Sequence, residues 1–222
     1  MLLSFVYIAT AIVASAIPVV ADLASGCNCD GVKPAQPNIT FMCGEELLGP
    51  AALNKTPPTL FAHYDQLGGL CPEEWLKKYT ETKNGTLVYR YPDDDGFQIS
   101  VDNNRTINGT DLTINGTDLT INGTELLLPG MLVDRFGRPS GKYLAPAYTP
   151  VSQRALPPRT LNPGGTYNLY NVSKPFNVSS GTTAAGFGQS GQGTQYHLLN
   201  GTTVQWYVEH GYLKEIKYES DL

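Results

Sequence analysis

The chain has 222 residues, a formal net charge of −5 and an aromatic content of 10%. The acidic balance argues against a non-specific nucleic-acid binder, which would carry a basic face, so we expect no nucleic-acid partner. The length suits one domain with a hydrophobic core, with or without an appendage.

The first residues predict a secretory leader. Residues 1–20 contain no Asp, Glu, Lys or Arg, and their apolar stretch ends at Ala14-Ser15-Ala16. Small residues at the last and third-last positions are what signal peptidase accepts, so we expect 1–16 to be a signal peptide. Pro18 interrupts the run before it reaches the roughly 20 apolar residues of a membrane span. We therefore expect a secreted, extracellular protein, either free or associated with the cell surface, without a membrane span.

The cysteines agree with an exported protein. The chain holds four of them, Cys27, Cys29, Cys43 and Cys71. An even number behind a leader predicts disulfides. A structural zinc site would need a second closely spaced Cys or His pair, which Cys43 and Cys71 do not form, so we expect no metal here. We expect Cys27 and Cys29 to pair with Cys43 and Cys71, in either of the two arrangements.

Acceptor sequons for N-glycans are dense along the chain. They occur at Asn38, Asn84, Asn104, Asn108, Asn115, Asn122, Asn171, Asn177 and Asn200. A further sequon at Asn54 is a weak acceptor because Pro57 follows its Thr56. Together with the leader, this density predicts a glycoprotein made on a eukaryotic secretory route.

Residues 17–88 carry the cysteines and one clear helix, over residues 70–79. Pro72 suits the first helical turn, where its missing N–H costs nothing. Acidic residues begin this segment and lysines end it, as the helix dipole favours. Trp75, Leu76 and Tyr79 would share one face. We expect a small helical and irregular region stapled by disulfides.

Residues 89–97 predict the end of a strand followed by a turn. The run Asp93-Asp94-Asp95-Gly96 lacks the ligand spacing and final Glu of an EF-hand loop. An exposed Asp-Gly turn is therefore the better interpretation.

An internal repeat occupies residues 106–126. Thr106-Ile107-Asn108-Gly109-Thr110-Asp111-Leu112 recurs twice, the last time with Glu125 in place of Asp. Each copy contains a sequon and the turn-forming pair Asn-Gly. So short a repeat cannot bury a core of its own. We expect a glycosylated surface loop inserted into the domain, and keep a short β-solenoid or adhesive strip as the alternative.

After the repeat, the pattern predicts many short strands. The candidates are a buried strand within 126–137, then 143–146, 167–172, 176–178, 196–199 and 212–216, while 203–209 is ambiguous between strand and helix. Short strands separated by Gly and Pro turns are typical of a β-dominated α+β domain. We place this domain at residues 89–222, behind the disulfide-stapled region.

Familiar catalytic motifs are absent from the sequence. The glycine-rich stretch 188–193 has neither the Lys-Ser/Thr of a P-loop nor the context of a dinucleotide fingerprint. No Gly-X-Ser-X-Gly motif suggests a serine hydrolase. The side-by-side pair Arg135-Phe136 and the segment from Arg154 to Pro158 remain. Two arginines can grip phosphates, and the aromatic ring would suit the flat rings of a dinucleotide.

These motifs, in this order, resemble the TNT domain, the NAD glycohydrolase domain named after the tuberculosis necrotizing toxin. The resemblance is carried by Leu128-Pro129-Gly130, Asp134 to Gly137, Ser140 to Pro146, Arg154 to Pro158 and Gly191 to Tyr196. The leader, the cysteine-bearing part and the stretch from Tyr91 to Phe97 are similar to the secreted fungal members, the conidial-surface NADases. The resemblance implies a TNT-type fold for this β-dominated domain.

The resemblance also implies roles for individual residues. Gln195 would act beside the nicotinamide ribose and Arg154 would hold the pyrophosphate, as the catalytic residues. Arg135, Phe136 and Tyr143 would line the substrate pocket, with Phe136 at the nicotinamide end. Nicotinamide leaves as a neutral molecule from an oxocarbenium-like ribose, so the site needs orientation and dipoles more than an acid. The sequence offers only Asp134 and Glu209 as candidates for a general base.

The implied reaction uses NAD+ and NADP+ as substrates and requires no cofactor. Fungal relatives imply a structural Ca2+ near the C-terminus, for which Glu215, Glu219 and Asp221 are candidates, and a homodimer. Two alternatives stay open at this point. One is a glycosylated surface-binding or adhesive protein in which the repeat is the active element. The other is an ADP-ribosyltransferase, which would pass the ribose to a protein instead of water.

Overall fold

The computed structural model describes residues 26–53, 55, 57–98, 100–102, 109–114, 117–161 and 167–217. The signal peptide predicted at 1–16 lies outside these residues. So do the sequons at Asn54, Asn104, Asn108 and Asn115, and the calcium candidates Glu219 and Asp221. Of the sequons within them, Asn38, Asn84, Asn177 and Asn200 are exposed and Asn171 is half-buried. Among the described residues, no helix combines the length and apolarity that crossing a bilayer requires.

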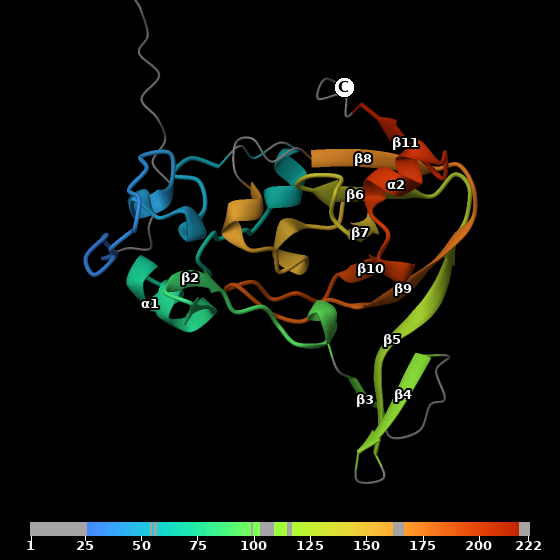
Figure 1. The fold of residues 1–222 in the computed structure, drawn as a ribbon, viewed down its shortest axis with the longest axis horizontal. Helices are drawn as coiled ribbons and strands as arrows, with labels where there is room; N and C mark the ends of the chain where they lie inside the picture. Colours follow the sequence, from blue (N-terminus) through green and yellow to red (C-terminus); the bar gives the residue numbers. More distant parts are fainter. Residues whose placement is uncertain are drawn as a thin grey trace, which may run out of the picture.

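Most of the described strands pair in antiparallel fashion into one large sheet (Figure 1). Its strands are β3 (Ser100–Asp102), β4 (Gly109–Ile114), β5 (Thr117–Leu127), β6 (Leu132–Phe136), β7 (Tyr143–Pro146), β8 (Tyr167–Val172), β9 (Phe176–Thr182), β10 (Thr194–Leu198) and β11 (Leu213–Ile216). Their order is β11-β8-β6-β7-β10-β9-β5-β3, with β4 beside β5. The strands predicted after the repeat are thereby confirmed, as is the β-dominated α+β class.

The main core lies where the sheet meets helix α2 (Val204–Glu209). Val133, Leu144 and Val178 point from three strands into one buried cluster, which Val204 and Tyr207 of α2 complete. The segment 203–209, ambiguous in sequence, is a helix because Thr203 caps it by accepting a hydrogen bond from the Trp206 N–H at 3.2 Å. This core fixes the sheet on which the candidate site is built.

The cysteine-bearing region folds as predicted around its helix, α1 (Pro72–Tyr79). The disulfides are Cys27–Cys71 and Cys29–Cys43, which selects one of the two arrangements expected. The region also contains a hairpin of β1 (Thr80–Lys83) and β2 (Thr86–Tyr89), which the sequence analysis did not predict beyond the strand end at Tyr89.

Short 3-10 helices complete the described part at Met42–Gly44, Glu46–Leu48, Pro58–Phe61, Asp94–Gly96, Val151–Gln153, Pro158–Leu161 and Leu199–Gly201.

Helix α1 packs against the segment that leads into β10. The fully buried Trp75 donates its indole N–H to the Phe187 carbonyl at 3.1 Å, and both rings belong to one apolar cluster. Gly68 and Gly188 touch through their backbones, since a Cβ on Gly68 would overlap the Gly188 carbonyl. The disulfide-stapled region is therefore fastened to the sheet domain; its boundary at residue 88 stays a prediction from sequence.

The repeat is not the surface loop that we expected. β4 and β5 pair as an antiparallel hairpin, with Asp111 opposite Thr120 and Ile114 opposite Thr117, and β5 continues to Leu127 beside β9. Figure 1 shows this hairpin projecting from one end of the sheet. The β-branched Thr and Ile of each copy favour strands, and the Asn-Gly pairs favour hairpin turns. The expectation of a loop was therefore wrong: the repeat forms paired strands, because β5 continues beside β9 and needs no core of its own.

Candidate active site

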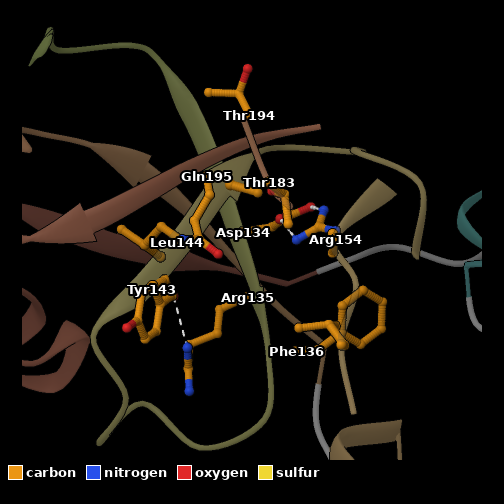
Figure 2. A pocket seen from close by; sticks show the side chains of 11 residues that line it. Asp134, Arg135, Phe136, Tyr143, Leu144, Arg154, Thr183, Thr194 and Gln195 are labelled. Carbon is orange, nitrogen blue, oxygen red and sulfur yellow. Dashed lines mark hydrogen bonds and ion pairs between the residues drawn. The ribbon is translucent and has the colours of Figure 1, made fainter. Parts of the chain in front are cut away.

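A cavity of about 500 Å³ opens beside strands β6, β7 and β10. A smaller recess of about 40 Å³ shares much of its lining. The five residues assigned to catalysis or substrate binding line both spaces, namely Arg135, Phe136, Tyr143, Arg154 and Gln195. Figure 2 shows them around the recess. A ligand pocket of a few hundred cubic ångströms accommodates a drug-sized or dinucleotide-sized molecule.

Neighbouring strands bring these residues together. β6 pairs with β7 through Asp134 and Ala145, and β7 pairs with β10 through Tyr143 and His197. Arg135, Tyr143 and Gln195 therefore come from three adjacent strands in the middle of the sheet. Arg154 follows the 3-10 helix Val151–Gln153 and enters from a connecting segment.

Arg154 is already paired with a buried carboxylate. Its Nη1 lies 2.6 Å from Asp134 Oδ1 and its Nη2 lies 2.8 Å from Oδ2, with side-chain exposures of 7% and 0%. The Tyr167 hydroxyl and the Tyr148 N–H also donate to Asp134 Oδ2, both at 2.8 Å. The Arg154 guanidinium packs over the Phe136 ring at 5.3 Å. The site thus holds a neutralised Arg–Asp pair, and Asp134, one of our two base candidates, is ion-paired at Oδ1 and hydrogen-bonded at Oδ2.

Arg135 is held differently, by backbone carbonyls. Its Nε donates to the Arg138 carbonyl and its Nη1 to the Tyr143 carbonyl, both at 2.8 Å. The guanidinium lies against Gly141, where a Cβ would overlap it. Burial lowers the pKa of Arg135, which remains a cation at neutral pH. In the described part of the chain, no ion pair joins Arg135 to an acidic side chain.

Gln195 reaches the cavity from β10 and is anchored by the Asp-Gly turn. Its Nε2 donates to the Asp95 carbonyl at 3.0 Å. The turn has left-handed backbone at Asp94, Asp95 and Gly96, with φ of +53°, +55° and +80°. Aspartate and glycine tolerate this region better than most residues. The predicted turn is confirmed, and it lies at the cavity rather than on a remote surface.

Tyr143 forms a second wall by stacking on His197. The two ring centroids are 4.6 Å apart with an interplanar angle of 17°. Burial raises the pKa of Tyr143, and the nearby Asp95 carboxylate adds to the effect. Burial also lowers the pKa of His197, against a smaller opposing effect of Asp95.

The cavity also contains residues that sequence reasoning did not select. Tyr91, Pro92 and Asp95 come from the segment before β3, and Ala184 and Phe187 from the segment before β10. The resemblance had drawn attention to the stretch from Tyr91 to Phe97, but without a role for any of its side chains. Glu209, the other base candidate, lies on α2 and bonds to Gln205 instead of lining the cavity.

Known proteins resemble this chain in sequence. The profile of the family described as Tuberculosis necrotizing toxin matches residues 126–216. The conidial surface nicotinamide adenine dinucleotide glycohydrolase nadA of Aspergillus fumigatus is 33% identical over 186 residues, which cover 81% of this chain and 72% of the relative. The chain belongs to the TNT-domain NAD glycohydrolase family. The family resemblance seen in the sequence is thereby confirmed.

Solved structures of similar proteins include two complexes with a partner protein. The tuberculosis necrotizing toxin, complexed with its immunity factor IFT, is 19% identical and covers 73% of this chain and 79% of its own, with a TM-score of 0.48. Tse6, in complex with Tsi6, is 19% identical and covers 44% of this chain and 72% of its own, with a TM-score of 0.31.

Proposed function

We propose that this protein hydrolyses the bond between nicotinamide and ribose in NAD+, giving nicotinamide and ADP-ribose. One observation carries the proposal. The residues that the family resemblance assigns to substrate and catalysis converge, from separate strands and a connecting segment, on a single cavity of about 500 Å³. Membership of the NAD glycohydrolase family supports the same reaction.

The two arginines have different roles in binding the anionic diphosphate of the substrate. Arg135 has no acidic partner among the described residues and therefore offers a full charge to the diphosphate. Arg154 shares its charge with Asp134, so it can donate hydrogen bonds but contributes little net attraction. We propose that Arg135 is the main ligand of the diphosphate. Arg154 holds the Phe136 ring in place at the base of the cavity and can donate further hydrogen bonds to the same diphosphate.

The nicotinamide ribose would lie beside Gln195. The Asp95 carbonyl engages the Gln195 amide nitrogen, which leaves the amide oxygen to face the substrate. Oriented dipoles stabilise positive charge that develops on the ribose without a proton transfer to the leaving group. Phe136 and Tyr143 provide flat walls for the rings.

The setting of the reaction follows from the leader and from the relative. The name of the fungal relative places that protein on the conidial surface, which supports a secreted or surface-associated glycoprotein here. We also propose NADP+ as a second substrate, and occupation of the exposed sequons by glycans. The homodimer and the calcium site near Glu215 stay predictions; the described residues contain no cluster of three or more acidic, His or Cys side chains suited to a metal.

A direct assay tests the proposed reaction. The purified, disulfide-intact protein is incubated with NAD+ and, separately, with NADP+, and nicotinamide and ADP-ribose are measured. We expect nicotinamide and ADP-ribose in equal amounts, and no ADP-ribose attached to added proteins. Gln195→Ala should abolish turnover while leaving the thermal unfolding midpoint unchanged. Absence of nicotinamide release at high enzyme concentration would refute the proposal, and ADP-ribose attached to protein would favour the transferase.

A further inference from the structure

Two carboxylates lie at the site, Asp134 in the small recess and Asp95 in the large cavity, and only Asp134 is ion-paired with an arginine. Asp134 is fully buried and ion-paired with Arg154. Asp95 lines the large cavity with a side-chain exposure of 65%. In the described residues, its ion-pair contact is with His197 Nδ1 at 3.7 Å. That contact is an ion pair only when His197 is protonated, and burial lowers the pKa of His197, so Asp95 has no permanently charged cationic partner among the described residues.

The Asp95 carboxylate lies at the same end of the cavity as Gln195. The backbone carbonyl of Asp95 accepts the hydrogen bond from Gln195 Nε2. Gly96 approaches the same amide closely, since a Cβ there would lie 3.7 Å from Gln195 Oε1. Tyr143, whose pKa is raised by burial and by Asp95, lies beside them. These contacts place a charged group next to the residue assigned to the reacting ribose.

The turn that carries Asp95 is held against the sheet despite its unfavourable backbone. The Ala184 N–H donates to the Gly96 carbonyl at 2.9 Å, and the Gln98 N–H donates to the Thr182 carbonyl at 2.7 Å. Non-glycine residues in left-handed conformations cost free energy and persist where the surrounding structure fixes them, often at functional sites. Here the conformation aims the Asp95 carbonyl at Gln195 and keeps Asp95 in the lining of the cavity.

We propose that Asp95 is a catalytic carboxylate that faces the cationic nicotinamide end of NAD+ and then the ribosyl cation. This inference rests on the proposed NAD+ cleavage. The substrate carries a positive ring at one end and a diphosphate in its middle. Arg135 and Asp95 present opposite, unneutralised charges on the walls of one cavity. Their arrangement orients the substrate as well as attracting it.

The reaction then balances with water as the only co-reactant. When the bond between C1′ and the ring nitrogen breaks, its electron pair leaves with nicotinamide, which becomes neutral. The positive charge passes to C1′ of the ribose, where the Asp95 carboxylate stabilises it. A water oxygen attacks C1′ and its proton passes to Asp95, which releases the proton to solvent. The products are nicotinamide, ADP-ribose and one proton.

Asp95→Asn is a sharp test because asparagine tolerates left-handed backbone and keeps the side-chain size. The matched controls are Asp93→Asn and Asp94→Asn, which remove the same charge from the same turn at residues that do not line the cavity. For each variant, kcat and KM for NAD+ are measured together with the inhibition constant of NADH, whose nicotinamide ring is uncharged. Thermal unfolding midpoints verify folding, and Asp95→Gly provides a second variant that accepts the backbone conformation.

We expect Asp95→Asn to lower kcat by about 10²-fold, the lower range for a general base. Its preference for NAD+ over NADH should fall by roughly 5-fold, the Coulomb effect of one charge at about 4 Å in water. The controls should change neither quantity by more than about 2-fold, within surface-charge effects. The inference is overturned if Asp95→Asn keeps its kcat and its NAD+ preference, or if the controls lose as much. An inactive wild-type protein would instead refute the proposed function.

Discussion

The buried Asp134–Arg154 pair makes a quantitative prediction. Asp134→Asn leaves Arg154 as a cation with a side-chain exposure of 7% and no counter-charge. Removing one partner of a buried ion pair costs about 3–5 kcal/mol, because the other charge stays desolvated. A domain of this size loses roughly 2–4 °C of Tm per kcal/mol, so we expect Tm to fall by roughly 6–20 °C. Arg154→Met should cost a similar amount.

Urea unfolding of the disulfide-intact protein measures this cost. Trp75 is fully buried and its fluorescence reports the transition. The double variant Asp134→Asn with Arg154→Met should be more stable than the sum of the single changes implies, by about 1–3 kcal/mol.

The matched control is Glu46→Gln, since Glu46 and Arg159 form an ion pair at 3.4 Å with both side chains about half exposed. Exposed pairs contribute about 0–1 kcal/mol, so this change should be nearly silent. If Asp134→Asn were as mild as Glu46→Gln, or if the two buried changes were simply additive, Arg154 would not depend on Asp134. The assignment of the diphosphate to Arg135 instead of Arg154 would then be wrong.

Two glycines near the site allow further tests. Gly96→Ala should cost about 1–2 kcal/mol because of its positive φ and, by moving the carbonyl that anchors Gln195, should lower kcat by about 10-fold or more. The control is Gly85→Ala, because Gly85 lies in an open turn with a φ of +77°, close to the +80° of Gly96. This control should lose the same stability and keep its kcat. If Gly96→Ala and Gly85→Ala had equal kcat values, the Asp95 carbonyl would not anchor Gln195. Gly141→Ala must displace the Arg135 guanidinium, so KM for NAD+ should rise in steady-state kinetics while Tm changes little; an unchanged KM would remove Arg135 from substrate binding.

The sequence predicts the local elements well where one signal dominates. Helix α1 follows from its proline, charge order and apolar face, and all the strands after the repeat were expected. The β1–β2 hairpin was missed although Asn84-Gly85 lies at its turn with positive φ at both residues. That pair, between strands that contain Thr82 and Thr86, is a hairpin signal as well as a sequon.

The candidate site was predicted only as far as the family resemblance reached. Arg135 and Gln195 were named because motifs carry them, and the structure places both at one cavity. Asp95 lies in the stretch from Tyr91 to Phe97 that resembles the fungal members, but the resemblance assigned it no role, and its run of aspartates is typical of an exposed turn. The pairing of Asp134 with Arg154 joins residues 20 positions apart, and no local pattern indicates which arginine is neutralised. Contacts of this kind depend on tertiary packing, which periodicity and spacing do not encode.

The Cys27–Cys71 bridge has a consequence for when the enzyme becomes competent. Cys71 begins α1, whose Trp75 supports Phe187 in the cavity wall. Disulfides form in the secretory pathway and not in the reducing cytosol. We therefore expect newly made chain in the cytosol to have an unsupported wall, and reduction of the pure enzyme to lower activity before the sheet unfolds. For a chain exported as its leader predicts, oxidation would then complete the enzyme only after it has left the NAD+ pool of the cell that makes it.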